Sequence, residues 1–211
     1  MNKKVKIILS HGIFSKGSGK NSVDKLAPLL IQEGYSVEQF NYGYIGIAMA
    51  LISNNWIAKR LAKIISEAAK DYDVIVYVAH SNGCAVGHIA SSKIKGVLLE
   101  RYDMTNLQYV YIAPALGRHQ YPDNYLVNKV TVLHSMSDKV LRAAGVWGRT
   151  MRRFRLILPT LPYGELGRKG YPTGVPMPYN NISFSRQQFD HGDYFKDENL
   201  RSIISIIKGV I

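Results

Sequence analysis

The stretch VIVYVAHSNG, residues 74–83, joins a run of apolar residues directly to a short turn. An unbroken apolar run of this length is typical of a strand that is buried on both faces of a sheet. Ser81 then stands between Ala79 and Gly83, and a strand-to-helix turn that exposes a nucleophile closes only if these two flanking positions are small. Glycine is more usual than alanine at the first of them, but alanine meets the same steric requirement. The alternative is a serine that only caps the following helix.

The rest of the chain alternates strand-like and helix-like patterns around this stretch. Apolar and β-branched runs predict further strands at residues 5–9, 37–42, 108–113, 129–134 and 181–185. Helical periodicity predicts helices at residues 22–33, 57–68, 82–92 and 200–207. This alternation predicts an α/β fold with a mostly parallel sheet of about six strands flanked by helices, in a single domain over residues 1–211.

A serine hydroxyl needs a base to become nucleophilic at neutral pH, and the base needs a carboxylate to orient it. Asp138 and His191 follow the last two predicted strands, where they could meet Ser81 at one edge of a parallel sheet. Serine, then acid, then histidine is also one of the known orders of a catalytic triad along a chain. Asp138 could instead only cap a helix, and Asp103 or Asp123 would then be the acid.

Four other histidines are expected to have structural positions and no catalytic role. By strand alternation, His80 is expected to point away from the face on which Ser81 acts. His134 is expected to pack near the acid, while His88 and His119 are expected in a helix or on the surface.

The stretch LSHGIFSKGSGKNS, residues 9–22, looks like a phosphate-binding loop but fails its spacing. That loop needs a glycine five positions before its Gly-Lys pair and a hydroxyl directly after the lysine. Here those positions hold Phe14 and Asn21, so both the phosphate cradle and the magnesium ligand are missing. We interpret residues 16–20 as a basic rim beside a pocket.

Composition limits the remaining alternatives. The 211 residues, 46% of them apolar, are enough for a sizeable core. The formal charge of +12 favours an acidic partner such as nucleic acid, an anionic membrane surface or an anionic substrate, although it also serves solubility. Cys84 is the only cysteine, which fits a reducing compartment, and no signal peptide or membrane span is recognised. We expect a cytoplasmic protein without cofactor or metal, and the oligomeric state stays open.

Residues 142–178 interrupt the regular pattern. They are rich in Gly and Pro and contain seven basic residues against a single acid, Glu165. Long irregular segments in compact domains are commonly lids or binding loops, so we expect an irregular basic flap before the last strand. Its arginines, Arg149, Arg152, Arg153 and Arg155, could hold an anionic substrate or an acidic membrane surface, or simply be solvated.

Five short motifs carry a family resemblance. HG at 11–12, AHSNG at 79–83, YIAPAL at 111–116, SMSDKV at 135–140 and DHGDYF at 190–195 together resemble the α/β-hydrolase superfamily over nearly the whole chain. AHSNGCA with YGELGRKGYPTG (163–174) is similar to a group of small hydrolase-like proteins of bacteria and their phages, which implies no particular substrate.

The resemblance implies roles for individual residues. It implies a triad of Ser81, His191 and Asp138, and an oxyanion hole formed by the backbone N–H groups of Ile13 and Asn82. Phe14 is the second choice for the first of these donors, and His11 is expected to brace the loop rather than to transfer protons.

The sequence is compatible with two functions. The first is a serine hydrolase that cleaves a small-molecule or lipid-like ester through an acyl-enzyme, with thioesters and amides open. The second is a binding protein on a hydrolase scaffold, which would hold nucleic acid or anionic lipid through its basic surface. The ordered triad favours the first function.

Overall fold

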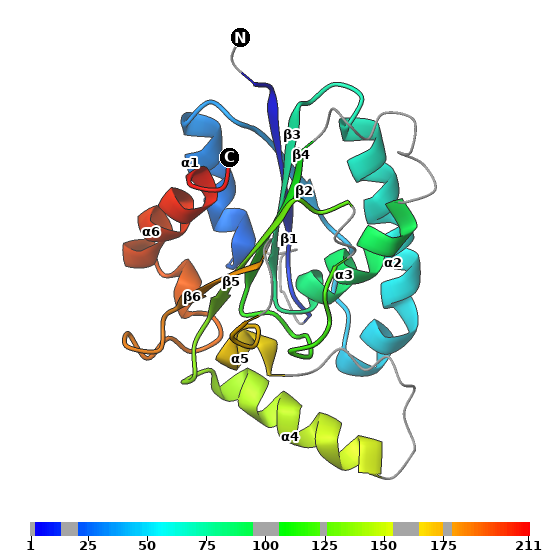
Figure 1. The fold of residues 1–211 in the computed structure, drawn as a ribbon, viewed down its shortest axis with the longest axis vertical. Helices are drawn as coiled ribbons and strands as arrows, with labels where there is room; N and C mark the ends of the chain where they lie inside the picture. The colour runs from blue at the N-terminus through cyan, green and yellow to red at the C-terminus, as the bar shows by residue number, and fades with distance from the viewer. Residues whose placement is uncertain (1–2, 14–20, 95–105, 123–125, 154–164, 175–178) are drawn as a thin grey trace.

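Six parallel strands form one sheet in the computed structural model of the chain (Figure 1). The structure describes residues 3–13, 21–94, 106–122, 126–153, 165–174 and 179–211, without the side chains of residues 47–49, 51–52 and 147–153. The strands are β1 (Val5–Ser10), β2 (Ser36–Phe40), β3 (Val74–His80), β4 (Asn106–Ile112), β5 (Lys129–His134) and β6 (Tyr179–Ser183). They are arranged in the order β2-β1-β3-β4-β5-β6, and each neighbouring pair is parallel. The predicted α/β class is therefore confirmed.

Helices cover both faces of the sheet (Figure 1). Helices α1 (Leu26–Gln32) and α6 (Asp197–Lys208) lie on one face, and α2 (Ile47–Ala68) and α3 (Asn82–Ile94) lie on the other. Each helix buries an apolar stripe, such as Leu200, Ile203, Ile204 and Ile207 of α6, against the strands. Because apolar side chains are buried on both faces, β3 is buried at all seven of its residues.

The strand register brings several carboxyl ends to one level of the sheet. Ser10 of β1 pairs with Ala79 of β3, and His80 pairs with Ile112 of β4. His134 of β5 pairs with Ser183 of β6. The segments that follow these strands therefore meet along a single edge, which is where parallel α/β sheets usually place their binding sites.

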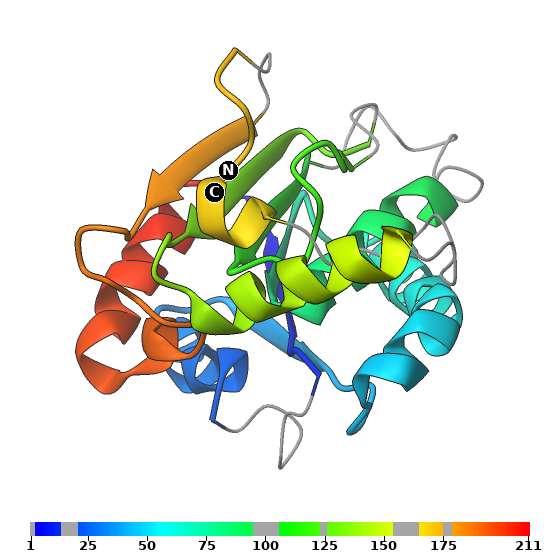
Figure 2. The ribbon, with the colours of Figure 1, turned by 90° about the horizontal axis from the view of Figure 1, so that it is seen from below.

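Helices α4 (Lys139–Arg153) and α5 (Leu166–Lys169) lie across that edge (Figure 2). The expectation of an irregular flap from residue 142 is wrong for residues 142–153, which are helical. The prolines of this segment begin only at Pro159, and Gly145 and Gly148 are tolerated inside the helix. Residues 154–164 and 175–178, which include Phe154, Arg155 and Tyr163, lie outside the described residues.

Most predicted boundaries agree with the structure within a few residues. Gly34, predicted to end the helix before β2, follows α1 with φ of +89°, a backbone conformation that favours glycine. One difference is larger: α2 begins at Ile47, ten residues before its predicted start, whereas β6 begins at Tyr179 rather than at 181.

Candidate active site

Ser81 occupies a sharp turn between β3 and α3. Its φ is +55°, in the left-handed region that residues other than glycine rarely adopt and that costs of order 1–3 kcal/mol. The turn is held because the Ser81 N–H donates to the Ile112 carbonyl at 3.0 Å, and the Ser81 carbonyl accepts from Cys84 and Ala115. Only 6% of the residue is exposed. Among the described residues other than glycine, Ala113 and Gln188 also have a positive φ, and Ser81 is the one of the three that the sequence predicts as a nucleophile.

The small residues around this turn are required by close contacts. A Cβ atom on Gly83 would lie 2.7 Å from the His11 carbonyl oxygen and 2.9 Å from that of Ser10. A Cβ atom on Gly12 would lie 2.9 Å from Ser81 Cβ. The loop after β1 therefore lies directly against the Ser81 turn, and neither glycine can carry a side chain without displacing it.

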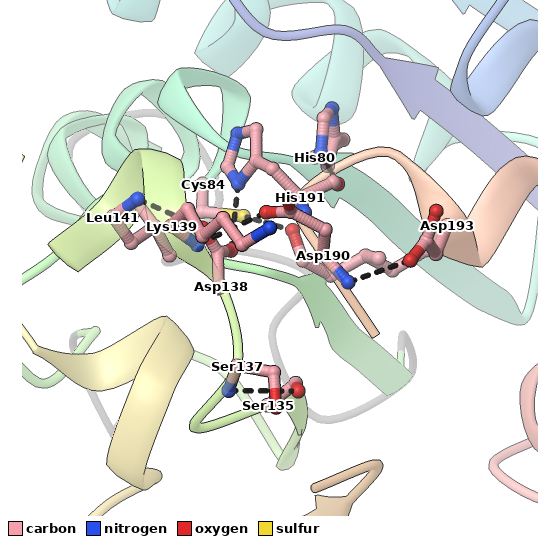
Figure 3. A network of polar contacts seen from close by, with 11 residues as sticks. His80, Cys84, Ser135, Ser137, Asp138, Lys139, Leu141, Asp190, His191 and Asp193 are labelled. Atoms are coloured by element: carbon pink, nitrogen blue, oxygen red, sulfur yellow. Dashed lines mark hydrogen bonds and ion pairs between the residues drawn. The ribbon is translucent and has the colours of Figure 1, made fainter. Parts of the chain in front are cut away.

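Asp138 and His191 form a direct pair at the ends of β5 and β6 (Figure 3). His191 Nδ1 lies 2.8 Å from Asp138 Oδ2, and the carboxyl side chain is fully buried. A carboxylate can only accept, so Nδ1 carries the proton and Nε2 of the neutral ring is left as the basic nitrogen.

Asp138 also caps α4. Its Oδ1 accepts the backbone N–H of Leu141 at 2.8 Å, which is the geometry of a helix N-cap. The two interpretations of Asp138 are thus not exclusive, because one carboxylate oxygen caps the helix while the other orients His191.

Asp190 links the two loops that carry this pair (Figure 3). Its Oδ1 accepts the backbone N–H of Lys139 at 3.0 Å and that of His191 at 2.8 Å. Its own N–H donates to Asp193 Oδ2 at 2.7 Å, and this bond, together with Lys196, lowers the pKa of the Asp193 carboxyl. The amino end of α4 and the histidine loop are therefore tied by one side chain.

The loop after β1 is braced from β2. His11 Nε2 lies 3.3 Å from Asn41 Oδ1, and the His11 ring stacks on Tyr42 with ring centroids 4.2 Å apart. The Tyr42 hydroxyl donates to the His11 carbonyl. These contacts agree with the expected bracing role of His11, which directly precedes the Gly12 that lies against Ser81.

Asn82 makes a buried contact that the sequence pattern does not signal. Its side-chain amide exchanges two hydrogen bonds, both of 3.0 Å, with Asn54 of α2. Asn82 is fully buried and Asn54 is 4% exposed. As the first residue of α3, Asn82 has a backbone N–H without an intrahelical acceptor, which suits an anion-binding role.

One other histidine, His80, differs from its expected position. His80 does not point away from the site: its Nε2 lies 3.0 Å from the His191 carbonyl oxygen, and the two rings have centroids 4.7 Å apart. Burial lowers the pKa of His80 well below its ordinary value, and His191 adds to this effect. His134 Nδ1 has the Arg168 carbonyl oxygen as its hydrogen-bond partner, and its packing near Asp138 stays a prediction.

Cys84 is a second nucleophile type close to Ser81, but it is not activated. Its Sγ donates to the Ala79 carbonyl at 3.2 Å, and burial raises the pKa of the thiol well above its ordinary value. The thiolate, which is the reactive form, is therefore suppressed.

The structure thus brings together four of the five predicted site residues around one edge. Asp138 and His191 are in contact, Ser81 adjoins His80, which contacts His191, and Asn82 follows Ser81. In the described part of the chain, Ser81 Oγ and His191 are not hydrogen bonded to each other, and such bonds are often long before substrate binds. Ile13 lies on the adjacent loop, whereas Phe14, Asp103 and Asp123 lie outside the described residues.

No group of three or more His, Cys, Asp or Glu side chains in the described residues is placed to hold a metal ion. None of the helices described is both long enough and apolar enough to cross a membrane.

Comparison with known proteins gives matches of structure only. No protein-family model matches the sequence, and no curated protein matches it. A protein from Xanthomonas campestris pv. campestris described as a hydrolase of the alpha/beta superfamily has 16% identity and a TM-score of 0.53, over 97% of this chain and 98% of the other. An esterase from Pyrococcus furiosus has 12% identity and a TM-score of 0.55, over 98% and 83%. A protein from Agrobacterium vitis S4, also described as a hydrolase, has 12% identity and a TM-score of 0.60, over 99% and 88%.

Proposed function

We propose, from the α/β-hydrolase fold of this chain, that it is a serine hydrolase that cleaves a carboxylic ester-like bond through an acyl-enzyme. The observation that carries the proposal is the buried Asp138–His191 pair, at 2.8 Å, beside a serine with a left-handed backbone. Strained serines and buried acid–base pairs cost stability, so their occurrence at one sheet edge favours a shared task.

The proposed reaction begins with attack of Ser81 Oγ on the carbonyl carbon of the substrate. His191 Nε2 takes the hydroxyl proton, and Asp138 stabilises the imidazolium that forms. The tetrahedral intermediate then expels the alcohol, which leaves with the proton held by His191. Water attacks the acyl-enzyme by the same route, giving a carboxylic acid and free Ser81.

The oxyanion of this intermediate needs hydrogen-bond donors. We assign them to the backbone N–H groups of Asn82 and Ile13, each worth about 3 kcal/mol of transition-state stabilisation. Support comes from the contact between the Gly12 segment and Ser81, and from the position of Asn82 at the start of α3.

A fluorophosphonate probe tests the proposal, because it reacts with activated serines. We expect the wild-type protein to be labelled, Ser81→Ala to be unlabelled, and the exposed-serine control Ser92→Ala to be labelled normally. Asp138→Asn and His191→Gln should label about 10³-fold more slowly or worse. A folded wild-type protein that does not react would contradict the proposal; if it reacts, p-nitrophenyl esters of graded acyl length then identify the preferred substrate.

A second candidate function is attachment to an anionic lipid surface. Met136, just before α4, and Val140 and Val146, in the first and middle turns of α4, are 47%, 53% and 53% exposed. Lys139 and Arg142 are exposed in the same stretch, and α4 lies at the site edge of the sheet (Figure 2). Apolar side chains among cations suit a lipid surface better than nucleic acid, which attracts the cations alone.

Flotation with phosphatidylglycerol vesicles tests this second candidate. We expect binding that weakens as salt rises, is weaker still on phosphatidylcholine, and falls at least about fivefold in Val140→Asp. An acidic residue in the first turn of α4 is compatible with folding. The control Ile31→Asp changes a residue of α1 that is 58% exposed and should bind as the wild type does. Equal losses in both variants, or binding to DNA without binding to vesicles, would reject the lipid surface.

A further inference from the structure

His80 lies inside the site although the proposed reaction gives it no role. It is the last residue of β3 and directly precedes Ser81. Its ring packs against His191 and meets the Phe195 ring edge-on, with centroids 4.9 Å apart. Only 7% of the residue is exposed, so its ring is packed on nearly all sides.

The contact with His191 determines which ring nitrogen carries the proton. His80 Nε2 lies 3.0 Å from the His191 carbonyl oxygen, and a carbonyl oxygen can only accept. Nε2 must therefore be the donor. Burial keeps the ring neutral by lowering its pKa, so Nδ1 is an unprotonated acceptor. Nδ1 has no hydrogen-bond partner among the described residues. The ring of His80 therefore forms its hydrogen bond in this part of the chain through Nε2–H.

Residue 191 is consequently held at three points. Asp138 accepts from its ring nitrogen Nδ1, Asp190 accepts from its backbone N–H, and His80 donates to its carbonyl. The first two contacts come from the loops after β5 and β6, whereas the third comes from the last residue of β3, which directly precedes Ser81. His80 therefore links the end of β3, next to Ser81, to His191 through a hydrogen bond.

We propose that His80 is a positioning residue, which sets His191 relative to Ser81 by donating its Nε2–H to the His191 carbonyl. This inference rests on the proposed function, because it concerns the base of the same site. Misplacement of a catalytic group by about 1 Å can cost 10²-fold in rate, so loss of this link should slow the reaction without weakening ligand binding.

Three substitutions of His80 distinguish the effect of its hydrogen-bond donor from the effect of the volume of its ring. Gln places an amide N–H at about the distance of Nε2, Asn is too short to reach the carbonyl, and Leu fills space without a donor. In fluorophosphonate labelling we expect His80→Leu and His80→Asn to lower the maximal inactivation rate about 10- to 100-fold with an unchanged inhibition constant. His80→Gln should recover to within about threefold of the wild type. The exposed-residue control His119→Gln should react as the wild type does.

Equal rates for His80→Gln and His80→Asn would overturn the proposal, as would a wild-type rate in a folded His80→Leu. A loss expressed only in the inhibition constant would also overturn it. Hydrogen exchange supplies a readout that needs no activity: amides of residues 184–192 should exchange about tenfold faster in His80→Asn than in His80→Gln. If the wild type is unreactive but this difference appears, the proposed function fails and the positioning role stands; if exchange is identical in the two variants, the positioning role fails.

Discussion

The buried side-chain amide of Asn54 in α2 forms its hydrogen bonds with another helix. It exchanges two hydrogen bonds with Asn82 across the interface between α2 and α3. We expect Asn54→Ala to lower the free energy of unfolding by about 1–3 kcal/mol, because it leaves the buried Asn82 amide without its partner. Urea denaturation measures this loss, and probe labelling should slow because Asn82 adjoins Ser81. The exposed neighbour Asn55 is the matched control, and Asn55→Ala should change stability by less than about 0.5 kcal/mol. Equal effects of the two substitutions would contradict the importance of the pair.

Single residues differ in how far sequence alone could identify them. Ser81, Asp138 and His191 could be found because each follows a strand pattern, and parallel strands bring their carboxyl ends together. Asn54 could not, because nothing local distinguishes it from Asn55. His80 was placed wrongly because strand alternation gives a direction relative to β3 only, whereas its environment is created by a loop 111 residues further along the chain.

Among the elements, the amino end of α4 depends on Asp190 as well as on Asp138. Asp190 Oδ1 accepts two backbone N–H groups, one from α4 and one from His191. We expect Asp190→Ala to destabilise the protein by about 1–3 kcal/mol and to slow probe labelling, since both donors lose their acceptor. Asp190→Asn retains an oxygen at the same place and should preserve most of both properties. Thermal melts and labelling rates check this; an Asn variant as damaged as the Ala variant would show that charge, not the acceptor, is what matters.

The elements that were least well predicted have identifiable physical reasons. Residues 47–56 at the start of α2 carry no charged residue, so they lack the contrast between two faces that marks a surface helix. Strand β6 lies at the edge of the sheet and is partly exposed at every residue, so its hydrophobic signal is weak. By contrast, β3 and β5 were predicted within one residue because their side chains are almost entirely buried.

For the molecule as a whole, the buried neutral histidine predicts how stability depends on pH. Burial holds the pKa of His80 in the folded protein well below 6.5. As pH falls below about 6.5, His80 therefore becomes protonated in the unfolded chain but stays neutral in the folded one. This contribution to stability is complete above that pH and is lost progressively below it, by up to about 1.4 kcal/mol per pH unit. Urea denaturation at pH 7, 6 and 5 should show a shallower decline for His80→Gln than for the wild type. Parallel declines would mean that the folded protein protonates His80 readily.

The class of the molecule could be predicted almost completely from the sequence, because strand and helix patterns alternate and a parallel sheet follows from that alternation. The alternation of strands and helices does not predict how α4 and α5 lie across the edge of the sheet. The start of the helix that includes residues 142–153 also depends on capping by Asp138, which has no periodic signature.

The order of the strands also has a consequence for the chain while it is being made. Ser81 follows β3, whereas His191 follows β6, which pairs with β5 and is the last of the described strands along the chain. Domains tend to fold from the amino end during synthesis, at about 5–20 residues per second. Under the proposed mechanism, the nucleophile therefore remains an ordinary alcohol on the ribosome until the loop that carries His191 has emerged and folded against it.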